Sequence, residues 1–311
     1  MRYRSFSQAG GVSSAVSVVL PDTSLREADR IKLVHAALES GINTFEIQSA
    51  NPEVALALAK ALETVDRRLV NVGLRMTWSA EAAQGRPAGT AAIASQIEIT
   101  TDRTGLKWLD WATIDAPDAE PPPQDAVVAM QAAKSAGRVR RLGIGGEGQA
   151  VQGHIQSGAF DILAMSFNVH SGWAARNRIK DASAREMAVI AYDRYPSRQS
   201  TELPAVLARA GGVLGRMLTG RPADESRPSG SGYAFMNETR GWNADQICLA
   251  YALTEPAIST IQVDPHDIDS LQGLAAVTEL ELPSGLAAQI EMARFSNLET
   301  ERPVDNQRRR A

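Results

Sequence analysis

The chain has 311 residues, a net charge of -4 and a pI near 5.7, with 44% hydrophobic and 22% charged residues. This composition supplies enough apolar material for a large globular core and excludes a disordered chain. A mildly acidic chain is also a poor candidate for general nucleic-acid binding, which needs a basic face to neutralise phosphates.

Short β-branched runs alternate with longer helical patterns along the chain, as is typical of βαβ units and a parallel sheet. The expected strands cover residues 14–20, 44–47, 69–74, 111–114, 141–144, 161–166, 187–192 and 259–263. The expected helices cover residues 25–40, 52–62, 89–99, 124–136, 149–157, 174–184, 203–210, 243–253, 267–277 and 283–295. Gly41 ends the first of these helices, and Asn243 is a plausible N-cap for a later one.

Eight alternations of strand and helix predict an α/β protein built as a (β/α)8 TIM barrel. Such a barrel would carry its functional groups at the C-terminal ends of the strands. A doubly wound open sheet is the alternative fold, and it would bind a nucleotide at a glycine-rich first turn. No G-x-G-x-x-G follows the first expected strand, so the barrel is favoured.

Composition also divides the chain into one barrel domain, residues 1–298, and a polar C-terminal tail, residues 299–311. Within the barrel, residues 219–237 are rich in Gly, Pro and Ser and are expected to form a flexible loop. Both irregular segments are candidates for contact with partners, and a solvated loop and a frayed terminus are the alternative. The tail ends in three arginines and Ala311, which suggests a degradation signal that Ala311→Asp would weaken.

Several features point to the cytoplasm. The N-terminus lacks the apolar segment of a signal peptide, and no stretch approaches the ~20 apolar residues of a membrane span. The single cysteine, Cys248, excludes an intramolecular disulfide and is expected to be a buried, unreactive thiol. The four histidines are scattered without the spacing of a metal site, so no metal is expected.

Collinear segments across residues 2–294 resemble the aldo-keto reductase family. The opening MRYRSFSQAGGVSSAVSVVL is similar to that family's N-terminal hairpin, and LVHAALESGINTFEIQSAN is similar to its second-strand segment. Further matches are WLDWATIDAPD, AVVAMQAAKSAGRVRRLGIGG, FDILAMSFNVH, VIAYDRY, GGVLGRMLTG and ADQICLAYALTEPAISTIQV. The resemblance implies a (β/α)8 barrel with a nicotinamide dinucleotide bound across its mouth.

The resemblance also implies a catalytic tetrad, and this chain departs from it at each position. In the family a tyrosine donates the proton, a lysine and an aspartate tune the tyrosine, and a histidine orients the substrate. The aspartate corresponds to Glu46, the tyrosine to Asn51, the lysine to Arg75 and the histidine to Asp115. Asn51 has no titratable proton, and Arg75 cannot exchange a proton as a lysine can. Asp115 would place negative charge where an alkoxide develops. We therefore expect no catalysis of this family's type.

A shifted alignment would not restore the tetrad. None of the five tyrosines lies near Asn51, and no lysine lies between Lys60 and Lys107.

The resemblance still implies groups that could hold a dinucleotide. Tyr192 would stack on the nicotinamide, unless it is only a core tyrosine, and Arg194 would pair with a phosphate, unless it is a surface arginine. Gly145 and Gly146 stand where the family has a Ser-Asn pair, and Ala164 stands where it has a glutamine, so side-chain contacts to the carboxamide are lost. The expected cofactor-binding residues are Gly145, Gly146, Tyr192, Asp193, Arg194, Tyr195, Gly215, Arg216, Leu218, Val263, Asp264 and His266.

The segment of residues 262–272 predicts which dinucleotide would bind. It contains three aspartates and no Lys or Arg, whereas NADP-preferring members have cations here for the 2′-phosphate. Carboxylates repel that phosphate and can accept a hydrogen bond from a free ribose hydroxyl. We expect NAD(H) to be preferred over NADP(H). His266, in the same segment, is either a ligand contact or a surface histidine.

A barrel that keeps a nucleotide but lacks the acid would suit a regulator. The lost tetrad is similar to that of catalytically inactive family members that control alphaproteobacterial cell division, which implies partners such as the Z-ring protein FtsZ, the kinase DivJ and protease machinery. An active enzyme, either an oxidoreductase or a lyase with a rearranged site of Glu46, Arg75 and Asp115, is the competing hypothesis. A structural subunit is a third option.

Overall fold

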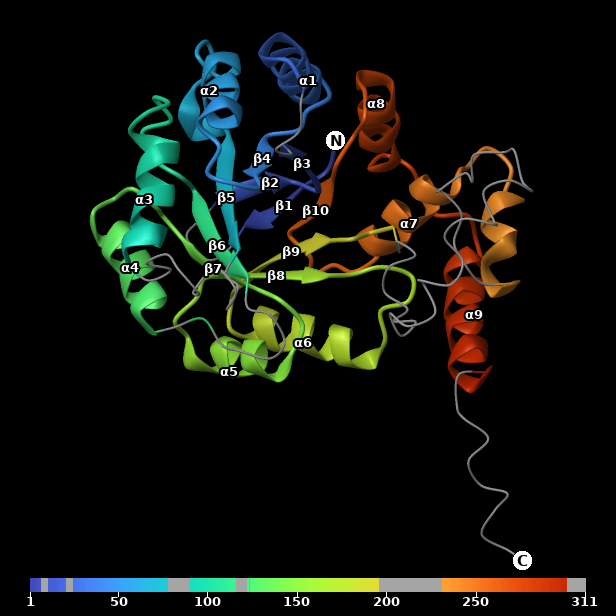
Figure 1. Cartoon of the computed structure of the whole chain (residues 1–311). Helices are drawn as coiled ribbons and strands as arrows, with labels where there is room; N and C mark the ends of the chain where they lie inside the picture. The colour runs from blue at the N-terminus through green and yellow to red at the C-terminus, as the bar shows by residue number, and fades with distance from the viewer. Residues whose placement is uncertain are drawn as a thin grey trace, which may run out of the picture.

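The centre of the molecule is a closed barrel of eight parallel strands (Figure 1). The computed structural model describes residues 1–6, 11–20, 25–77, 90–115, 122, 124–195 and 231–300. Around the barrel the strands follow the order β10-β3-β4-β5-β6-β7-β8-β9. They are β3 (Val16–Leu20), β4 (Thr44–Ile47), β5 (Asn71–Thr77), β6 (Trp111–Asp115), β7 (Leu142–Gly145), β8 (Ile162–Ser166), β9 (Ala188–Tyr192) and β10 (Thr260–Val263). The expected (β/α)8 barrel is therefore confirmed.

Helices form an outer layer around this barrel (Figure 1). In the described part of the chain they are α1 (Glu27–Glu39), α2 (Pro52–Ala61), α3 (Thr90–Thr101), α4 (Gln124–Ser135), α5 (Gln149–Ser157), α6 (Trp173–Ala184), α7 (Ala244–Leu253), α8 (Ile268–Val277) and α9 (Leu286–Thr300). Each corresponds to an expected helix within a few residues. The expected helix at residues 203–210 lies outside the described residues, and so do residues 301–311 of the expected tail. Residues 299 and 300, the first two of that tail, belong to α9.

The expected first strand, residues 14–20, is divided in the structure. Its start belongs to β2 (Gly11–Ser14), which pairs antiparallel with β1 (Tyr3–Phe6), and only β3 enters the barrel. This hairpin closes one end of the barrel. The Phe6 ring packs inside it at 5.3 Å from the Trp111 ring, within a cluster that includes Ile162 and Ile190.

The prediction of a flexible loop at residues 219–237 is wrong for its C-terminal part. Ser231–Asn237 forms a 3-10 helix, η5, in which Tyr233 and Met236 are buried against α7 and α9. Two large apolar side chains bury enough surface to order this segment, although its glycines and serines are typical of a loop. Residues 219–230 lie outside the described residues.

The structure confirms two local predictions, that Asn243 is an N-cap and that Cys248 is buried. Asn243 caps α7, where its side chain accepts a hydrogen bond from the Gln246 N–H at 2.8 Å and Gln246 reciprocates. Cys248 is buried in α7, and burial raises the pKa of its thiol to about 12. Among the described residues, no helix is both long enough and apolar enough to cross a membrane.

Candidate functional site

A cavity of about 970 Å³ opens at the C-terminal ends of the barrel strands. This is the end at which (β/α)8 barrels hold their functional groups. Its wall combines residues that follow β4, β9 and β10 with the first turns of α7 and α8. The lining residues are Val19, Gln48, Arg75, Tyr192, Asp193, Arg194, Tyr195, Asn237, Asn243, Ala244, Asp245, Gln262, Val263, Asp264, His266 and Ser270.

Arg75, on β5, contacts side chains of the adjacent strand β6 and of β9, which lies across the barrel from β5. Its Nε donates to the Asp115 carboxylate on β6 at 2.8 Å, and its guanidinium lies 4.1 Å from the centre of the Tyr192 ring on β9. Burial lowers the pKa of Arg75, but Asp115 and Glu46 offset that effect and the pKa is raised above its usual value. Arg75 is therefore a permanent cation, and its guanidinium group already contacts a carboxylate and an aromatic ring.

Glu46, on β4, lies deeper and has no exposed surface. One carboxylate oxygen accepts a hydrogen bond from the indole Nε1 of Trp111 at 3.3 Å, and the other has no hydrogen-bond partner among the described residues. Burial raises the pKa of Glu46, although the charge of Arg75 and the amide of Gln262 oppose this shift. The Trp111 indole reaches Glu46 only because residue 73 is glycine, since a Cβ there would lie 1.9 Å from the ring.

Asp115 and Gly145 fit together across the pairing of β6 with β7. The two residues are register partners, and a Cβ on Gly145 would lie 2.1 Å from the Asp115 carboxylate. The Asp115 side chain thus fills the space that a side chain at position 145 would need. The residue types at positions 115 and 145 are therefore coupled by packing in this barrel.

Asn51 has a structural task outside the charged cluster. It is the N-cap of α2, and its side chain accepts a hydrogen bond from the Glu53 N–H at 2.8 Å. Asparagine is among the best residues for this position, because its oxygen satisfies a backbone donor that the helix leaves open. The structure brings Glu46, Arg75 and Asp115 together as one charged cluster, while Asn51 sits at a helix end beside it.

Arg194 holds the opposite wall of the cavity. It is buried, and its guanidinium lies 3.0 Å from Asp245 at the start of α7 and 3.3 Å from Asp264 after β10. It follows Asp193, whose backbone has the left-handed φ of +50°. The expectation of a surface arginine is wrong, because Arg194 ties together two segments that are far apart in the sequence.

Seven of the twelve residues expected to bind a cofactor line the cavity. They are Tyr192, Asp193, Arg194, Tyr195, Val263, Asp264 and His266. Gly145 and Gly146 do not line it, and the Gly146 N–H donates to the Ala164 carbonyl at 3.0 Å, so it is not free to hold a carboxamide. Gly215, Arg216 and Leu218 lie outside the described residues.

The sequence interpretation missed Asp245 and Gln262. Asp245 appeared only within the expected helix of residues 243–253, and Gln262 only within the expected strand and as the first residue of the segment 262–272. Neither position carries a signal of its contact with Arg194 or Glu46, because both contacts join segments distant in sequence.

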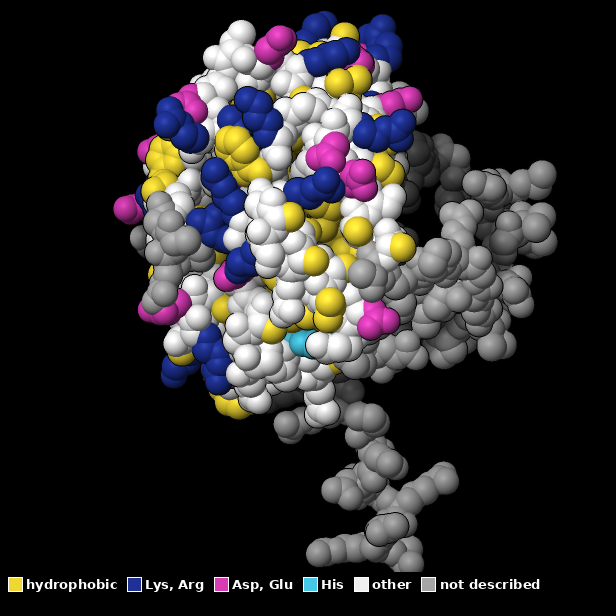
Figure 2. Space-filling model, turned by 90° about the vertical axis from the view of Figure 1, so that its left-hand side faces the viewer, with side chains coloured by type: hydrophobic (Ala, Val, Ile, Leu, Met, Phe, Trp, Pro, Cys, Tyr) yellow, Lys and Arg dark blue, Asp and Glu magenta, His cyan; other side chains and the backbone are white. Residues whose placement is uncertain are grey.

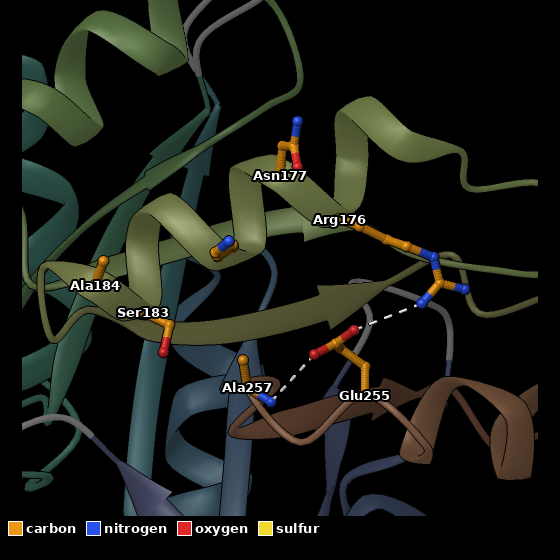
Figure 3. Close-up of a pocket in the computed structure, with 7 residues that line it drawn as sticks. Arg176, Asn177, Ser183, Ala184, Glu255 and Ala257 are labelled. Carbon is orange, nitrogen blue, oxygen red and sulfur yellow. Dashed lines mark hydrogen bonds and ion pairs between the residues drawn. The ribbon is translucent and has the colours of Figure 1, made fainter.

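A second cavity, of about 490 Å³, lies between α6 and the segment that joins α7 to β10. Arg176 contributes to it and forms an ion pair with Glu255 (Figure 3). Arg176 also forms an ion pair with Glu291. The lining of this second cavity shares no residue with that of the first cavity. Within the described ranges, no group of three or more His, Cys, Asp or Glu side chains is placed to hold a metal ion.

No protein-family model matches this sequence, and no curated protein matches it either. Solved structures do match. The aldo-keto reductase AKR11C1 from Bacillus halodurans in its holo form superposes with a TM-score of 0.70 at 14% identity, over 94% of this chain and 96% of that chain. Its apo form gives a TM-score of 0.68 at the same identity and coverage. This likeness shows that the fold is a (β/α)8 barrel of the aldo-keto reductase type.

Proposed function

We propose that this chain is a non-catalytic regulatory protein of aldo-keto reductase descent that binds NAD(H). The observation that carries the proposal is the cluster of Arg75, Asp115 and Tyr192. The cation that stands where the family has a lysine is held by a carboxylate and stacked on an aromatic ring. Asn51, which stands where the family has the proton donor, caps α2 instead.

Tyr192 is a poor substitute for the missing proton donor. Burial raises the pKa of its phenol above the usual value near 10, and Arg75 offsets only part of that shift. An effective general acid has a pKa close to the working pH. The chemistry of the cluster thus supports binding without proton transfer.

The cavity at the mouth fits a dinucleotide in its size and in its donor set. Tyr192 would offer one ring face to a nicotinamide, since the other carries the Arg75 guanidinium. Arg194 would face the pyrophosphate, and Asp264, whose side chain is 70% exposed, would accept a hydrogen bond from a ribose hydroxyl. Asp264 would also repel a 2′-phosphate, which favours NAD(H) over NADP(H).

Calorimetric titration with NADH, with NADPH as the control, tests this proposal. We expect micromolar binding of NADH and much weaker binding of NADPH, and no NADH-dependent reduction of carbonyl compounds. The variant Ser270→Arg, which adds a cation to the cavity wall, should strengthen NADPH binding and so reduce the difference between the affinities for NADH and NADPH. Turnover of a carbonyl substrate, or the absence of binding to either dinucleotide, would overturn the proposal.

We further propose that the bound dinucleotide controls contacts with protein partners in the cytoplasm. In its altered tetrad and its acidic segment after β10, the chain resembles the alphaproteobacterial cell-division regulator KidO, which suggests FtsZ, DivJ and protease machinery as partners. A ligand shifts such contacts only if it binds one conformation more tightly. Binding of purified FtsZ should therefore differ with and without NADH, and identical binding would argue against this role.

An enzyme with a rearranged site is the second candidate function. It is favoured by the raised pKa of Glu46 and by its carboxylate oxygen that lacks a partner beside Arg75. Glu46 and Asp115 would serve as the acid and the base of a lyase or isomerase reaction. Any turnover lost in Glu46→Gln but kept in the wall variant Ser270→Arg would support this candidate.

A further inference from the structure

Three loops at the N-terminal ends of β5, β6 and β7 form a basic surface opposite the mouth cavity. They are residues 66–69, 102–110 and 138–140. We call this surface the Trp108 patch, and it consists of Trp108 and the six cations Arg67, Arg68, Arg103, Lys107, Arg138 and Arg140. Figure 2 looks onto this side of the molecule and shows Lys and Arg side chains gathered among exposed hydrophobic side chains.

The patch has a rigid centre. The Trp108 ring is contacted by two guanidinium groups, with Arg67 at 4.8 Å and Arg140 at 4.4 Å from the ring centre. Both arginines also pair with the Asp110 carboxylate, at 2.8 and 3.0 Å, and the side chain of Asp110 is only 3% exposed. The carboxylate that assembles the centre is therefore hidden beneath the cations that it holds.

The charge of the patch is unbalanced. Six cations stand against three carboxylates in the three loops, an excess of three positive charges in a chain whose net charge is -4. Asp66 pairs with Arg68, and Asp102 pairs with Arg138. Arg103 and Lys107 are exposed and have no ion-pair partner among the residues that the structure describes.

Lys107 is also held in an unusual backbone conformation. Its φ is +64°, in the left-handed region that residues other than glycine and asparagine rarely adopt. This turn joins the buried Leu106 to Trp108, and Lys107 remains exposed beside the ring. Strain of this kind persists where the surroundings fix the turn, and it often marks functional surfaces.

We propose that the Trp108 patch is a docking surface for an acidic segment of a partner protein. Carboxylates of such a segment would pair with Arg103, Lys107 and the outward faces of the flanking arginines. A single-stranded nucleic acid fits less well, because its bases need a free aromatic face and the Trp108 ring already carries two guanidinium groups. This inference is independent of the proposed dinucleotide site, which lies at the other end of the barrel.

The test uses a fluorescently labelled polyglutamate peptide of about ten residues and measures its binding to the full chain by fluorescence anisotropy at low salt. The test variant is Arg103→Gln/Lys107→Gln. The control is Lys32→Gln/Lys180→Gln, which removes the same charge from two exposed lysines on α1 and α6. None of these four side chains has an ion-pair partner in the described structure, so neither variant should disturb the fold.

We expect the test variant to bind the peptide about five-fold more weakly and the control to change by less than two-fold, since exposed charge pairs contribute up to about 1 kcal/mol each. Salt should weaken wild-type binding strongly, because it screens exposed charges. Equal losses in both variants, or no measurable binding at low salt, would overturn the proposal. So would tighter binding of an oligothymidylate of equal charge, which would assign the patch to nucleic acid.

Discussion

At the scale of single residues, burial and neighbouring charge in the barrel interior shift the pKa of Glu46 in opposite directions. Glu46 has no exposed surface, and burial alone disfavours its carboxylate. Arg75 favours the carboxylate from the next strand, two positions nearer the strand's C-terminal end than Gly73, the register partner of Glu46. Asp115 satisfies Arg75 from the other side. Removing one member of such a cluster leaves the others with uncompensated buried charge, which costs more than the pair contributes.

The raised pKa of Glu46 predicts a pH dependence of stability. A carboxyl group whose folded pKa lies above its ordinary value of 4.5 binds more protons in the folded state. The free energy of unfolding therefore falls as the pH rises from about 4.5 through the folded pKa. Glu46→Gln should abolish this decline, and urea unfolding at pH 5 and pH 7 would measure it. An identical pH dependence in both proteins would show that Glu46 is not its source.

The contact between Gly145 and Asp115 predicts a steric effect. In Gly145→Ala the added methyl group meets the Asp115 carboxylate, so Asp115 must move from Arg75, and we expect a loss of about 1–3 kcal/mol in the free energy of unfolding. Gly153→Ala on α5 is the control, because nothing lies within 4 Å of its new methyl group and alanine favours helix. The control should be neutral or stabilising, and a similar loss in both would contradict this explanation.

At the scale of elements, two helix N-termini shape the wall of the mouth cavity. Asn243 caps α7 and Asp267 caps α8. In both caps a side-chain oxygen accepts a hydrogen bond from a backbone N–H of the first turn. Arg194 then ties the first turn of α7, through Asp245, to the segment after β10. The wall is thus fixed by three segments that the sequence places far apart.

The cap of α7 can be tested directly. Asn243→Ala removes the oxygen that accepts from Gln246, and we expect it to cost about 1 kcal/mol of stability, seen as a lower midpoint of thermal unfolding. Asn243→Asp keeps a capping oxygen and places negative charge at a helix N-terminus, so it should retain wild-type stability. Equal destabilisation by both variants would mean that the amide group itself is required.

At the scale of the whole molecule, the N-terminal hairpin closes the barrel end that lies opposite the mouth. Phe6 is fully buried inside the barrel against Trp111, and the Arg141 guanidinium lies 5.6 Å from its ring centre. The interior thus has an apolar floor of Phe6, Ile162 and Ile190 beneath the polar cluster of Glu46, Arg75 and Asp115. This floor seals the cluster from solvent on one side.

Removing the plug should weaken the whole barrel. Phe6→Ala would leave a cavity under Trp111, and we expect a loss of about 3–5 kcal/mol in the free energy of unfolding by urea. Val12→Ala, on the partner strand with 53% of its surface exposed, should cost less than about 0.5 kcal/mol. A small effect at Phe6 would mean that the hairpin is not an integral part of the core.

The barrel could be predicted because hydrophobic periodicity is a local property. The expected limits of β4 and α5 are those observed, since each lies between clear turn signals. The charged cluster was found through resemblance to a family, because adjacent strand ends meet in a barrel. The contacts of Asp245 with Arg194 and of Gly145 with Asp115 could not be predicted, since they depend on side-chain packing between separate strands and helices.

The complementary fit of Asp115 and Gly145 constrains how this chain could change over evolutionary time. A histidine at position 115 would remove the anion that holds Arg75, and a serine at 145 would collide with the present Asp115 carboxylate. Because residues in contact respond non-additively to substitution, a change at either position is expected to be deleterious until its neighbour has changed. Epistasis between positions 115 and 145 therefore restricts the order in which substitutions in this interior can accumulate.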